Sequence, residues 1–459
     1  MQRPSTSLDR AAICDALTEK RRLCFLGIGG IGMSALAEWC YRSGIPVYGH
    51  DRAHSENTAR LSCLGIPVTV GDGFSFAPDT ALAVTTAALS EKDPLLAAVN
   101  EVAIPLVSRA DLLSAVASFY ENVIAVAGTH GKSTTTAILS AILSAANAEP
   151  TVLCGAVMPE TNSPLLYGDR RFLVIEACEY RRSFLALSPT AAVVLSTERD
   201  HPDTYADDGA TLAAYRDFLH LPTVKIAVTR SDVGDGFLFA SEAAGADLYA
   251  TDVAYERGCA SFIPVLFGRK APRVTLRVAG KHNLENACAA YLTAYLHGIS
   301  VDAIAKGLSA YRGIARRMEY VGKCKGAYIY TDYAHHPTEI RAAIDCARKM
   351  TSGKVIVVFE AHTYSRTKAF YPAFLSALSM ADHLFVPDIF AARETDTLGM
   401  SGKRMARDAG GVYIADARAA KAAIMPLLSE DDLVLFMGAG NFFHVSREFP
   451  LDGEGEHLL

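Results

Sequence analysis

The sequence lacks several features that mark secreted, zinc-binding or membrane proteins. Its ten cysteines include no Cys-x-x-Cys pair, which is typical of reduced thiols in a cytoplasm rather than of a disulfide framework or a zinc site. No apolar run reaches membrane-spanning length, so we expect no membrane insertion. Residues 1–22 contain acidic side chains and no apolar segment, so we expect no signal peptide and a cytoplasmic protein.

A net positive charge is also absent, since the formal charge is −6 at pH 7. Without a broad basic field we expect no nucleic-acid partner. The chain of 459 residues is too long for one ordinary core, which predicts two to four domains. Half of the residues are hydrophobic, as in a globular enzyme.

Short apolar runs alternate with alanine-rich helical patterns along most of the chain, which predicts an α/β fold with largely parallel sheets. A β-rich, charged stretch interrupts this alternation before the helical segment 283–298. We expect boundaries near residues 120 and 322, giving regions 1–120, 121–322 and 323–459. The strands expected here are 23–26, 46–50, 67–70, 81–86, 105–108, 122–128, 172–177, 191–196, 327–332, 354–360, 383–388 and 432–438.

A glycine-rich loop follows the first of these strands and opens a helix. It fits G-x-G-x-x-G with Gly27, Gly29 and Gly32, has a further glycine at Gly30, and is followed by Asp51 at a strand end. Such glycines allow backbone N–H groups to approach a diphosphate, and the carboxylate can accept a ribose hydroxyl. The alternatives are a plain strand–helix turn or, for the same motif, a nicotinamide site in an oxidoreductase.

A second loop, GTHGKS, lies between the strand NVIAVAG and the helical STTTAILSAILSAA. The usual phosphate-loop pattern would place a glycine at Val126. The strand–loop–helix context nevertheless predicts phosphate binding, with Lys132 on the terminal phosphates and Ser133 or Thr134 on Mg²⁺. The candidate nucleotide contacts in this loop are Gly128, Thr129, His130, Gly131, Lys132, Ser133 and Thr134.

A magnesium ion at this loop needs oxygen ligands from other segments. Glu176 directly ends a buried strand, and the next strand runs into TERDHPD, which offers Glu198, Asp200 and His201. The alternative is that these are solvated loop charges, and His201 has weight only beside Glu176 and the phosphate loop.

Eight motifs occur along the chain in the order GTHGKSTT, EACEYRRSFL, DHPDTY, GKHNLENACAA, ARRMEY, DYAHHPTEI, HTYSRT and GAGN. Together they resemble the Mur ligases, the ATP-dependent amino-acid ligases of peptidoglycan synthesis. With GIGGIGMS the resemblance covers nearly the whole chain. Mur ligases carry this shortened phosphate loop, so Val126 is no objection, and their first glycine loop holds a UDP-sugar rather than a nicotinamide.

The resemblance implies three domains: a Rossmann-like domain for the UDP-sugar, a central ATP-binding domain and a Rossmann-like domain for the incoming amino acid. It implies ATP and Mg²⁺ as cofactors, with UDP-N-acetylmuramate and L-alanine as the expected substrates. The γ-phosphoryl group of ATP would activate the lactyl carboxylate, and the amine would attack the acyl phosphate. Catalysis would consist mainly of positioning and charge neutralisation.

The resemblance also implies roles for single residues. The expected catalytic residues are Lys132, Glu176, His201, Arg317 and His335. The expected metal ligands are Ser133, Thr134, Glu176 and His201. Further expected nucleotide contacts are His282, Asn283, Asn286, Arg317 and Asp332. The expected substrate contacts are Gly27, Gly29, Gly30, Gly32, Asp51, Tyr333, His335, His336 and Arg366, with Arg366 on the amino acid's carboxylate.

Plain structural roles compete with several of these assignments. Asn283 could be a helix N-cap, Arg317 could form a surface salt bridge, and the paired histidines could be loop packing. The chain also departs from the family pattern. Ser196 and Thr197 stand where Asn-Ile is frequent, Glu360-Ala361 replaces a common Gln-Pro, and Thr363 stands where some members have arginine. Glycine or L-serine therefore compete with L-alanine.

Three other functions compete with this ligase. An oxidoreductase explains only residues 23–51 and gives GTHGKS no role. A non-catalytic UDP-sugar-binding relative predicts loss of Lys132, Glu176 or the DYAHHP residues, and all are present. A recycling ligase that attaches a whole peptide to the same sugar needs a roomier amino-acid pocket. A monomer and a homodimer are both compatible with the sequence.

Overall fold

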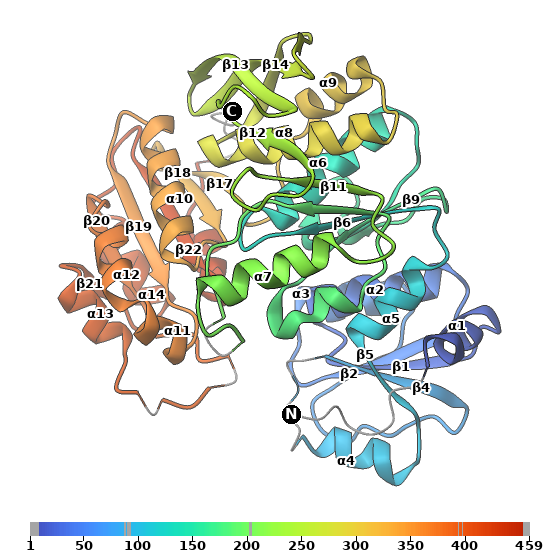
Figure 1. Cartoon of the computed structure of the whole chain (residues 1–459). Helices are drawn as coiled ribbons and strands as arrows, with labels where there is room; N and C mark the ends of the chain where they lie inside the picture. Colours follow the sequence, from blue (N-terminus) through green and yellow to red (C-terminus); the bar gives the residue numbers. More distant parts are fainter. Residues whose placement is uncertain are drawn as a thin grey trace. The chain divides into compact units, whose positions relative to one another are not determined.

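The computed structural model describes residues 9–452 apart from 87–88, 90–92, 202–203, 393 and 397. The chain divides into two compact units. Figure 1 labels the helices and strands and colours them by their position in the sequence. The first unit comprises Met1–Glu198, Asp208–Leu238 and Leu296–Ile299. The second comprises Arg199–Asp207, Phe239–Tyr295 and Ser300–Leu459.

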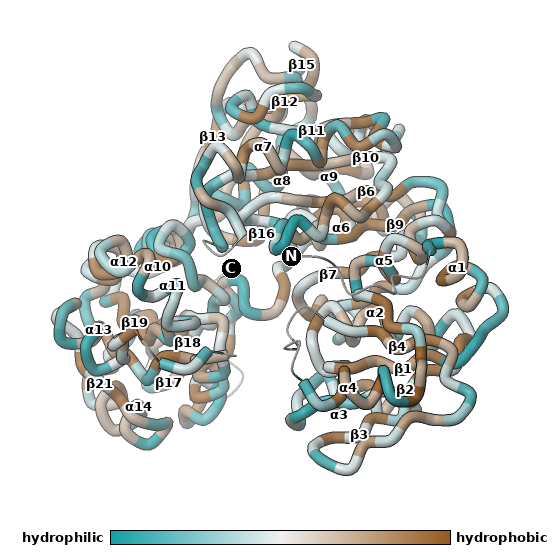
Figure 2. The backbone as a smooth tube through the Cα atoms, turned by 60° about the horizontal axis from the view of Figure 1, so that its bottom comes forward, coloured by the Kyte–Doolittle hydropathy of each residue, from teal (hydrophilic) through white to brown (hydrophobic). Residues whose placement is uncertain are grey.

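The first unit begins with a parallel sheet in the order β3-β2-β1-β4-β5. The chain order reverses beside β1, and such a switch point is where doubly wound sheets bind ligands. In Figure 2 the hydrophobic colour follows β1 and β4, as buried parallel strands require. The strands are β1 Arg22–Leu26, β2 Val47–Asp51, β3 Val68–Val70, β4 Thr80–Thr85 and β5 Leu106–Ser108. The helices are α1 Arg10–Thr18, α2 Ile31–Arg42, α3 Glu56–Cys63, α4 Pro94–Glu101 and α5 Arg109–Ala117.

The first unit continues with strands in the order β11-β10-β6-β9-β7-β8, all parallel except β8. Strand β6 lies between β9 and β10, so the loop that follows β6 is flanked by the ends of both neighbours. The strands are β6 Asn122–Ala127, β7 Thr151–Met158, β8 Ser163–Leu166, β9 Phe172–Glu176, β10 Ala191–Val194 and β11 Ile226–Thr229. The helices are α6 Lys132–Ala145, the 3₁₀ helix η1 Tyr180–Ala186 and α7 Asp208–Leu219. One division between the two units falls within strand β12 (Phe237–Ala240), after Leu238.

The second unit opens with the β-rich stretch that the sequence predicted. Its strands β13, β14, β15 and β16 pair with one another antiparallel, whereas most other strand pairs of the chain are parallel. Helix α9 packs on β16. The elements are β13 Leu248–Glu256, β14 Cys259–Leu266, β15 Arg269–Lys270, β16 Val274–Ala279, α8 Lys281–Leu296 and α9 Val301–Ala310.

A second sheet of this unit has the order β17-β18-β22-β19-β20-β21 and is parallel except for β17. Both of its faces are covered, because successive residues of β22 enter different cores: Leu433 and Leu435 pack with α10 and α12, Val434 and Phe436 with α14. The strands are β17 Glu319–Cys324, β18 Ala327–Asp332, β19 Val355–Glu360, β20 His383–Val386, β21 Val412–Tyr413 and β22 Leu433–Gly438. The helices are α10 Pro337–Met350, α11 Tyr364–Ala369, α12 Tyr371–Leu378, α13 Gly402–Asp408, α14 Ala417–Ile424 and the 3₁₀ helix η2 Phe442–Glu448.

The predicted α/β class with largely parallel sheets is confirmed, and the predicted strands are present to within a few residues. Strand β17 spans residue 322 and pairs with β18, and the three predicted regions remain a prediction. The ten cysteines are free thiols, as expected. Among the described residues no helix combines the length and apolar character needed to cross a bilayer.

Candidate functional site

The first glycine-rich loop is closed by hydrogen bonds to the strand beside it. The amides of Gly27 and Ile28 both donate to the carbonyl of His50, at 2.8 and 3.0 Å. The amide of Gly29 donates to Asp51 Oδ2 at 2.8 Å, and that of Gly30 donates to Gly27 at 3.2 Å. The loop amides therefore hold the loop itself, and the donors available to a ligand are those of the first turn of α2.

Asp51 lies where the sequence predicted it, next to the loop, but its Oδ2 is engaged by Gly29. A methyl group on Gly29 would lie 2.9 Å from this oxygen, so the close approach requires glycine. Gly32 lies in the first turn of α2, and a methyl group there would lie 3.3 Å from Nη1 of Arg109. Arg109, which was not predicted from the sequence, begins α5 after β5 and brings a positive charge to this helix start.

The second glycine-rich loop is anchored to the end of β10. The amides of Thr129 and His130 donate to the carbonyl and the hydroxyl of Ser196, at 3.0 and 2.9 Å. Gly128 and Gly131 both adopt positive φ, and Gly131 is the residue before α6. Helix α6 then begins at Lys132, so its first-turn amides are available to an anion. Ser196 departs from the family pattern, but here it fixes the loop.

Lys132 is held inside the loop by a buried carboxylate. Its Nζ contacts the two oxygens of Glu179 at 2.9 and 3.1 Å and donates to the carbonyls of Gly128 and Thr129 at 2.5 and 3.2 Å. Burial alone lowers the pKa of Lys132, but the charge of Glu179 outweighs it, and the pKa lies above its ordinary value. The lysine is therefore fully charged and neutralised by Glu179, a partner that the sequence analysis did not consider.

The oxygens predicted for a metal lie at the same strand ends. Glu176 pairs in register with Val126, two residues before the loop, and accepts a hydrogen bond from the amide of Gly155 through Oε1. Ser133 and Thr134 occupy the first turn of α6 and are buried. These three side chains offer only oxygen donors, which is the donor set that suits Mg²⁺. His201, the fourth predicted ligand, belongs to the second unit and has a positive φ of 58°.

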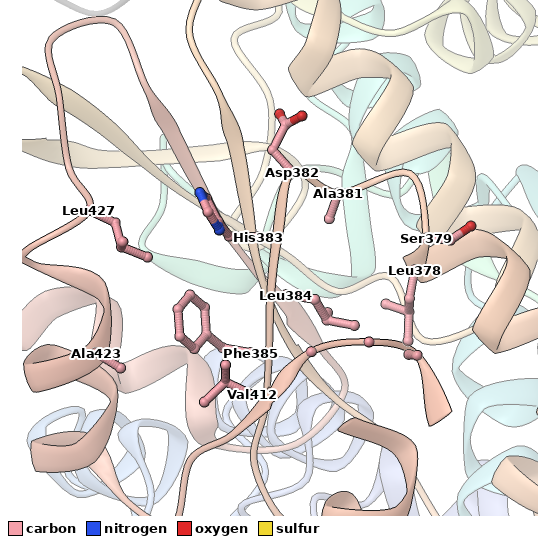
Figure 3. A pocket seen from close by; sticks show the side chains of 13 residues that line it. Leu378, Ser379, Ala381, Asp382, His383, Leu384, Phe385, Val412, Ala423 and Leu427 are labelled. Carbon is pink, nitrogen blue, oxygen red and sulfur yellow. The ribbon is translucent and has the colours of Figure 1, made fainter. Parts of the chain in front are cut away.

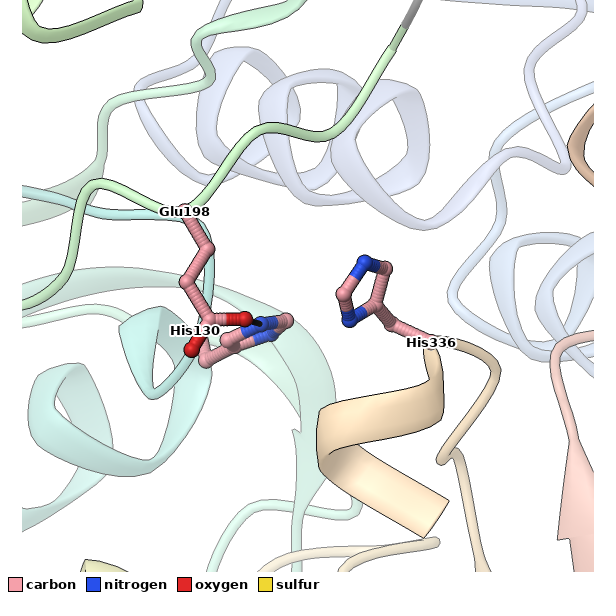
Figure 4. Close-up of side chains that lie close together, drawn as sticks. All are labelled: His130, Glu198 and His336. Atoms are coloured by element: carbon pink, nitrogen blue, oxygen red, sulfur yellow. Dashed lines mark hydrogen bonds and ion pairs between the residues drawn. The ribbon is translucent and has the colours of Figure 1, made fainter. Parts of the chain in front are cut away.

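His130 contacts a residue of the chain that the sequence did not identify as its partner. Its Nε2 lies 3.2 Å from Oε2 of Glu198, as the dashed line in Figure 4 marks. The hydroxyl of Thr129 donates to the carbonyl of Glu198 at 2.6 Å. Glu198 thus supports the loop from the segment that follows β10. Figure 4 also draws His336, which belongs to the second unit.

The predicted nucleotide residues of the second unit begin at α8. Asn283 is the third residue of this helix, and its side chain donates to the carbonyl of Ala279 at 2.7 Å. It is therefore not an N-cap, which was the competing structural role. Asn286 donates to Asn283 at 3.2 Å, and both are buried, whereas His282 is exposed.

Asp332 ends β18 and is also committed to the backbone. Its two oxygens accept from the amides of Met318 and Ala334, at 2.8 and 2.7 Å. Burial raises the pKa of this carboxyl group, and the nearby charge of Arg317 opposes the rise. Arg317 lies 3.8 Å from Glu339 and stacks over Tyr333 at 5.4 Å, so it is a half-buried member of this cluster rather than an isolated surface charge.

His335 and His336 stand between β18 and α10 and have different environments. Nδ1 of His335 lies 2.9 Å from the carbonyl of Tyr333, which makes that nitrogen the N–H donor. Burial lowers the pKa of His335 to about 4, so the ring is neutral at pH 7 and Nε2 carries a lone pair. His336 is the N-cap of α10, where Nδ1 accepts from the amide of Thr338 at 3.4 Å.

Arg366, predicted to meet an amino-acid carboxylate, is paired with a carboxylate of the chain. Its Nη2 lies 2.9 Å from each oxygen of Asp200, and Nε lies 3.2 Å from Oδ1. Both side chains are at most 9% exposed. Burial alone raises the pKa of Asp200, but the charges of His201 and Arg366 outweigh it, and the pKa lies well below its ordinary value.

These residues of the second unit share one edge of its sheet. Tyr333 and His335 follow β18, and His362 and Arg366 follow β19, which is parallel to β18 through β22. The rings of His335 and His362 are 6.0 Å apart. A cavity of about 480 Å³ lies instead at residues 381–385 and 409–412, where β20 and β21 begin (Figure 3). It contains none of the predicted residues and lies at the opposite edge from where parallel sheets bind ligands.

The comparisons of this chain with known proteins all indicate the same family. Sequence profiles match residues 22–121 as "Mur ligase family, catalytic domain", 126–294 as "Mur ligase middle domain" and 316–440 as "Mur ligase, glutamate ligase domain". The UDP-N-acetylmuramate–L-alanine ligase of Agathobacter rectalis is 35% identical over 446 residues, covering 92% of this chain and 96% of that protein. The enzyme of the same name from Clostridium novyi is 35% identical and covers 94% of this chain and 97% of its own.

Solved structures agree. The UDP-N-acetylmuramate-alanine ligase MurC of Thermotoga maritima has a TM-score of 0.81 and 25% identity, covering 94% of this chain and 98% of its own. The murein peptide ligase of Psychrobacter arcticus has a TM-score of 0.70 at 23% identity, covers 93% of this chain and 98% of its own, and shows the shared fold alone. The chain therefore belongs to the Mur ligase family.

Proposed function

We propose that this chain is an ATP-dependent ligase that joins L-alanine to the lactyl carboxylate of UDP-N-acetylmuramate, giving UDP-N-acetylmuramoyl-L-alanine, ADP and phosphate for peptidoglycan synthesis. The observation that carries the proposal is the 35% identity, over 92% of the chain, to a ligase named for this reaction. An oxidoreductase is not supported, because the family membership assigns its first glycine loop to a different ligand. We further propose a cytoplasmic location.

The chemistry needs an activated carboxylate, because a free carboxylate is a poor electrophile. Transfer of the γ-phosphoryl group of ATP to the lactyl carboxylate forms an acyl phosphate, and the attacking amine then displaces phosphate. Lys132 supplies a positive charge at the phosphate loop, and the first-turn amides of α6 supply hydrogen-bond donors. Such charge neutralisation and positioning are the main catalytic terms in phosphoryl transfer.

We propose that Ser133, Thr134 and Glu176 hold Mg²⁺ in this loop, with His201 as a further ligand. The all-oxygen donor set of the first three supports this, and Glu176 has a second oxygen besides the one that accepts from Gly155. Bound magnesium would supply charge neutralisation for the phosphates. In the first unit, the helix start at Gly32 and the guanidinium of Arg109 suit the diphosphate of the UDP-sugar.

In the second unit we propose that the edge formed by Tyr333, His335, His336 and Arg366 takes the amino acid. The neutral Nε2 of His335 accepts a hydrogen bond from the amino acid's ammonium group and thereby orients the amine. Arg317, Asp332, His282 and Asn286 are proposed as nucleotide contacts. The three profile ranges support a division into a UDP-sugar domain, an ATP domain and an amino-acid domain.

The test is ATP-dependent phosphate release with Mg²⁺ and UDP-N-acetylmuramate, comparing L-alanine, glycine, L-serine and an L-Ala-γ-D-Glu-containing tripeptide. We expect release with L-alanine and a product heavier by one alanyl residue in mass spectrometry. Preferred use of the tripeptide would assign the chain to peptide recycling instead. No release with any acceptor would contradict a ligase and favour a UDP-sugar-binding protein.

We expect Glu179→Gln to lower the KM for ATP about fivefold, because Glu179 competes with the phosphates for Lys132 and the lost charge is worth about 1 kcal/mol. The matched control is Glu160→Gln, an exposed glutamate of the turn between β7 and β8. The KM for the UDP-sugar should be the same in both variants. An unchanged or higher KM for ATP in Glu179→Gln would show that Glu179 does not compete.

A further inference from the structure

Arg366 is the side chain that the proposed function assigns to the amino acid's carboxylate, yet its best binding edge is already used. A guanidinium binds a carboxylate most strongly through two parallel N–H groups. In Arg366 the Nε and Nη2 edge forms such a fork with Asp200, with N–O separations of 2.9 to 3.2 Å. The remaining donors are on Nη1, which lies 3.4 Å from Nδ1 of His362.

Asp200 is itself fixed for this contact. Its Oδ1 accepts from the amide of His201 at 2.8 Å, and its side chain is 8% exposed. A buried charge left alone costs several kcal/mol, so each member of this pair needs the other. Asp200 also directly precedes His201 in the chain, which places the pair beside the segment proposed to reach the metal.

We propose that Asp200 is a specificity-determining residue: an internal carboxylate that occupies the Nε and Nη2 edge of Arg366 and leaves the amino acid only the Nη1 edge beside His362. This proposal rests on the proposed function and names the residue that sets how strongly Arg366 binds the amino acid's carboxylate. The Arg366–Asp200 pair taken together has little net charge, so its guanidinium binds the substrate carboxylate weakly and through one side. The amino acid is thereby held by Nη1 together with its ammonium contacts rather than by its carboxylate alone.

The first test compares Asp200→Asn with the wild type in the phosphate-release assay. The amide keeps the shape and removes the charge, so we expect the KM for L-alanine to fall about fivefold to tenfold. Propionate, which is alanine without its amine, should inhibit about tenfold more strongly for the same reason. The KM for ATP and that for the UDP-sugar should stay within about twofold of the wild type, which a general loss of structure would not permit.

The matched control is Asp382→Asn, which breaks another arginine–aspartate pair of this unit. Asp382 pairs with Arg348 just before β20, where both side chains are more than one third exposed. This variant should leave both alanine KM and propionate inhibition unchanged. The proposal would be overturned if folded Asp200→Asn had the same KM for L-alanine and the same inhibition by propionate as the wild type.

A measurement without turnover separates this inference from the proposed function. In ¹⁵N spectra of the wild-type protein, the Arg366 Nε–H, assigned with Arg366→Lys, should exchange with water much more slowly than exposed arginines. Propionate should shift the Nη1 signals while the Nε–H stays protected. Fast Nε–H exchange in the wild type would overturn the inference even if Asp200→Asn does not fold. A protected Nε–H in a protein that ligates no acceptor would contradict only the proposed function.

Discussion

Lys132→Ala abolishes ligation and leaves UDP-sugar binding intact: this is the largest effect that we expect on activity. The variant removes the only side-chain cation that contacts the loop carbonyls of Gly128 and Thr129 in the part of the chain that the structure describes. Removal of one preorganised hydrogen-bond donor that faces the charge developing in the transition state lowers turnover about 10²–10³-fold. A phosphate-loop lysine also binds ATP in the ground state, so we expect turnover to fall more than about 10³-fold. The measurement is phosphate release at saturating ATP.

UDP-sugar binding should change by less than about twofold in Lys132→Ala, because the first glycine loop is closed by His50 and Asp51 and has its own helix start at α2. Calorimetric titration with UDP-N-acetylmuramate measures this directly. Lys132→Arg is the useful companion, since it keeps the charge that Glu179 needs. Equal loss of UDP-sugar binding and turnover in Lys132→Ala would contradict two separate phosphate loops.

The strand ends were predictable from the sequence, and the reason is local. Buried parallel strands are continuous apolar runs, so the residue that ends each run is visible as the first polar or glycine position. Glu176 ends FLVI in this way, and the structure places it in register with Val126 at the phosphate loop. Asp51 also ends its strand and reaches Gly29, but β2 contains Gly49 and His50, so Asp51 was predictable from its spacing after the glycine-rich loop rather than from an apolar run. The fold class and this half of the candidate site therefore follow from periodicity and glycine spacing.

The partners of these side chains were not predictable. Glu179 lies three residues after Glu176 in the same motif, and nothing in the sequence says which of the two carboxylates meets Lys132; the structure gives it to Glu179. The sequence offers Asp200 as an oxygen ligand near the metal, but in the structure it binds Arg366, which is 166 residues away in sequence. Long-range pairs of this kind depend on side-chain direction and burial, which sequence patterns alone do not contain.

Strand β17 shows the same limit in the backbone. The segment EYVGKC mixes apolar residues with charged residues and a glycine, so the sequence did not predict a strand there. Its partner β18 is strongly apolar and supplies the pairing, and Glu319 stands opposite Thr331 in the antiparallel register. A strand whose existence depends on its neighbour is not visible from its own propensity.

Loss of the Glu38 charge should produce the largest change in stability. Glu38 of α2 is 1% exposed, and its carboxylate accepts from Nε of Arg42 at 2.8 Å, from Oγ of Ser163 at 2.7 Å and from Nη1 of Arg60. Nε and Nη2 of Arg60 are buried without a partner, so Glu38 is what neutralises this guanidinium. Removing one member of a buried pair costs about 3–5 kcal/mol, and we expect that loss in the free energy of unfolding for Glu38→Gln.

Urea unfolding followed by the fluorescence of Trp39 measures this locally, because Trp39 is the single tryptophan and lies on the same helix. The double variant Glu38→Leu with Arg60→Met should recover most of the lost stability, since it removes both charges. The control is Asp345→Asn, in an exposed pair with Lys349, which should cost at most about 0.5 kcal/mol.

Burial alone raises the pKa of Glu38, but hydrogen bonds from Ser163, Arg42 and Arg60 outweigh it, and the pKa lies below its ordinary value of 4.5. Because the folded-state pKa lies below the unfolded one, the stabilisation is complete above about pH 4.5 and is lost as the pH falls further. The wild type and Glu38→Gln should therefore converge in stability on acidification, and a constant difference down to pH 3 would show that the effect of the variant comes from packing and not from the charge.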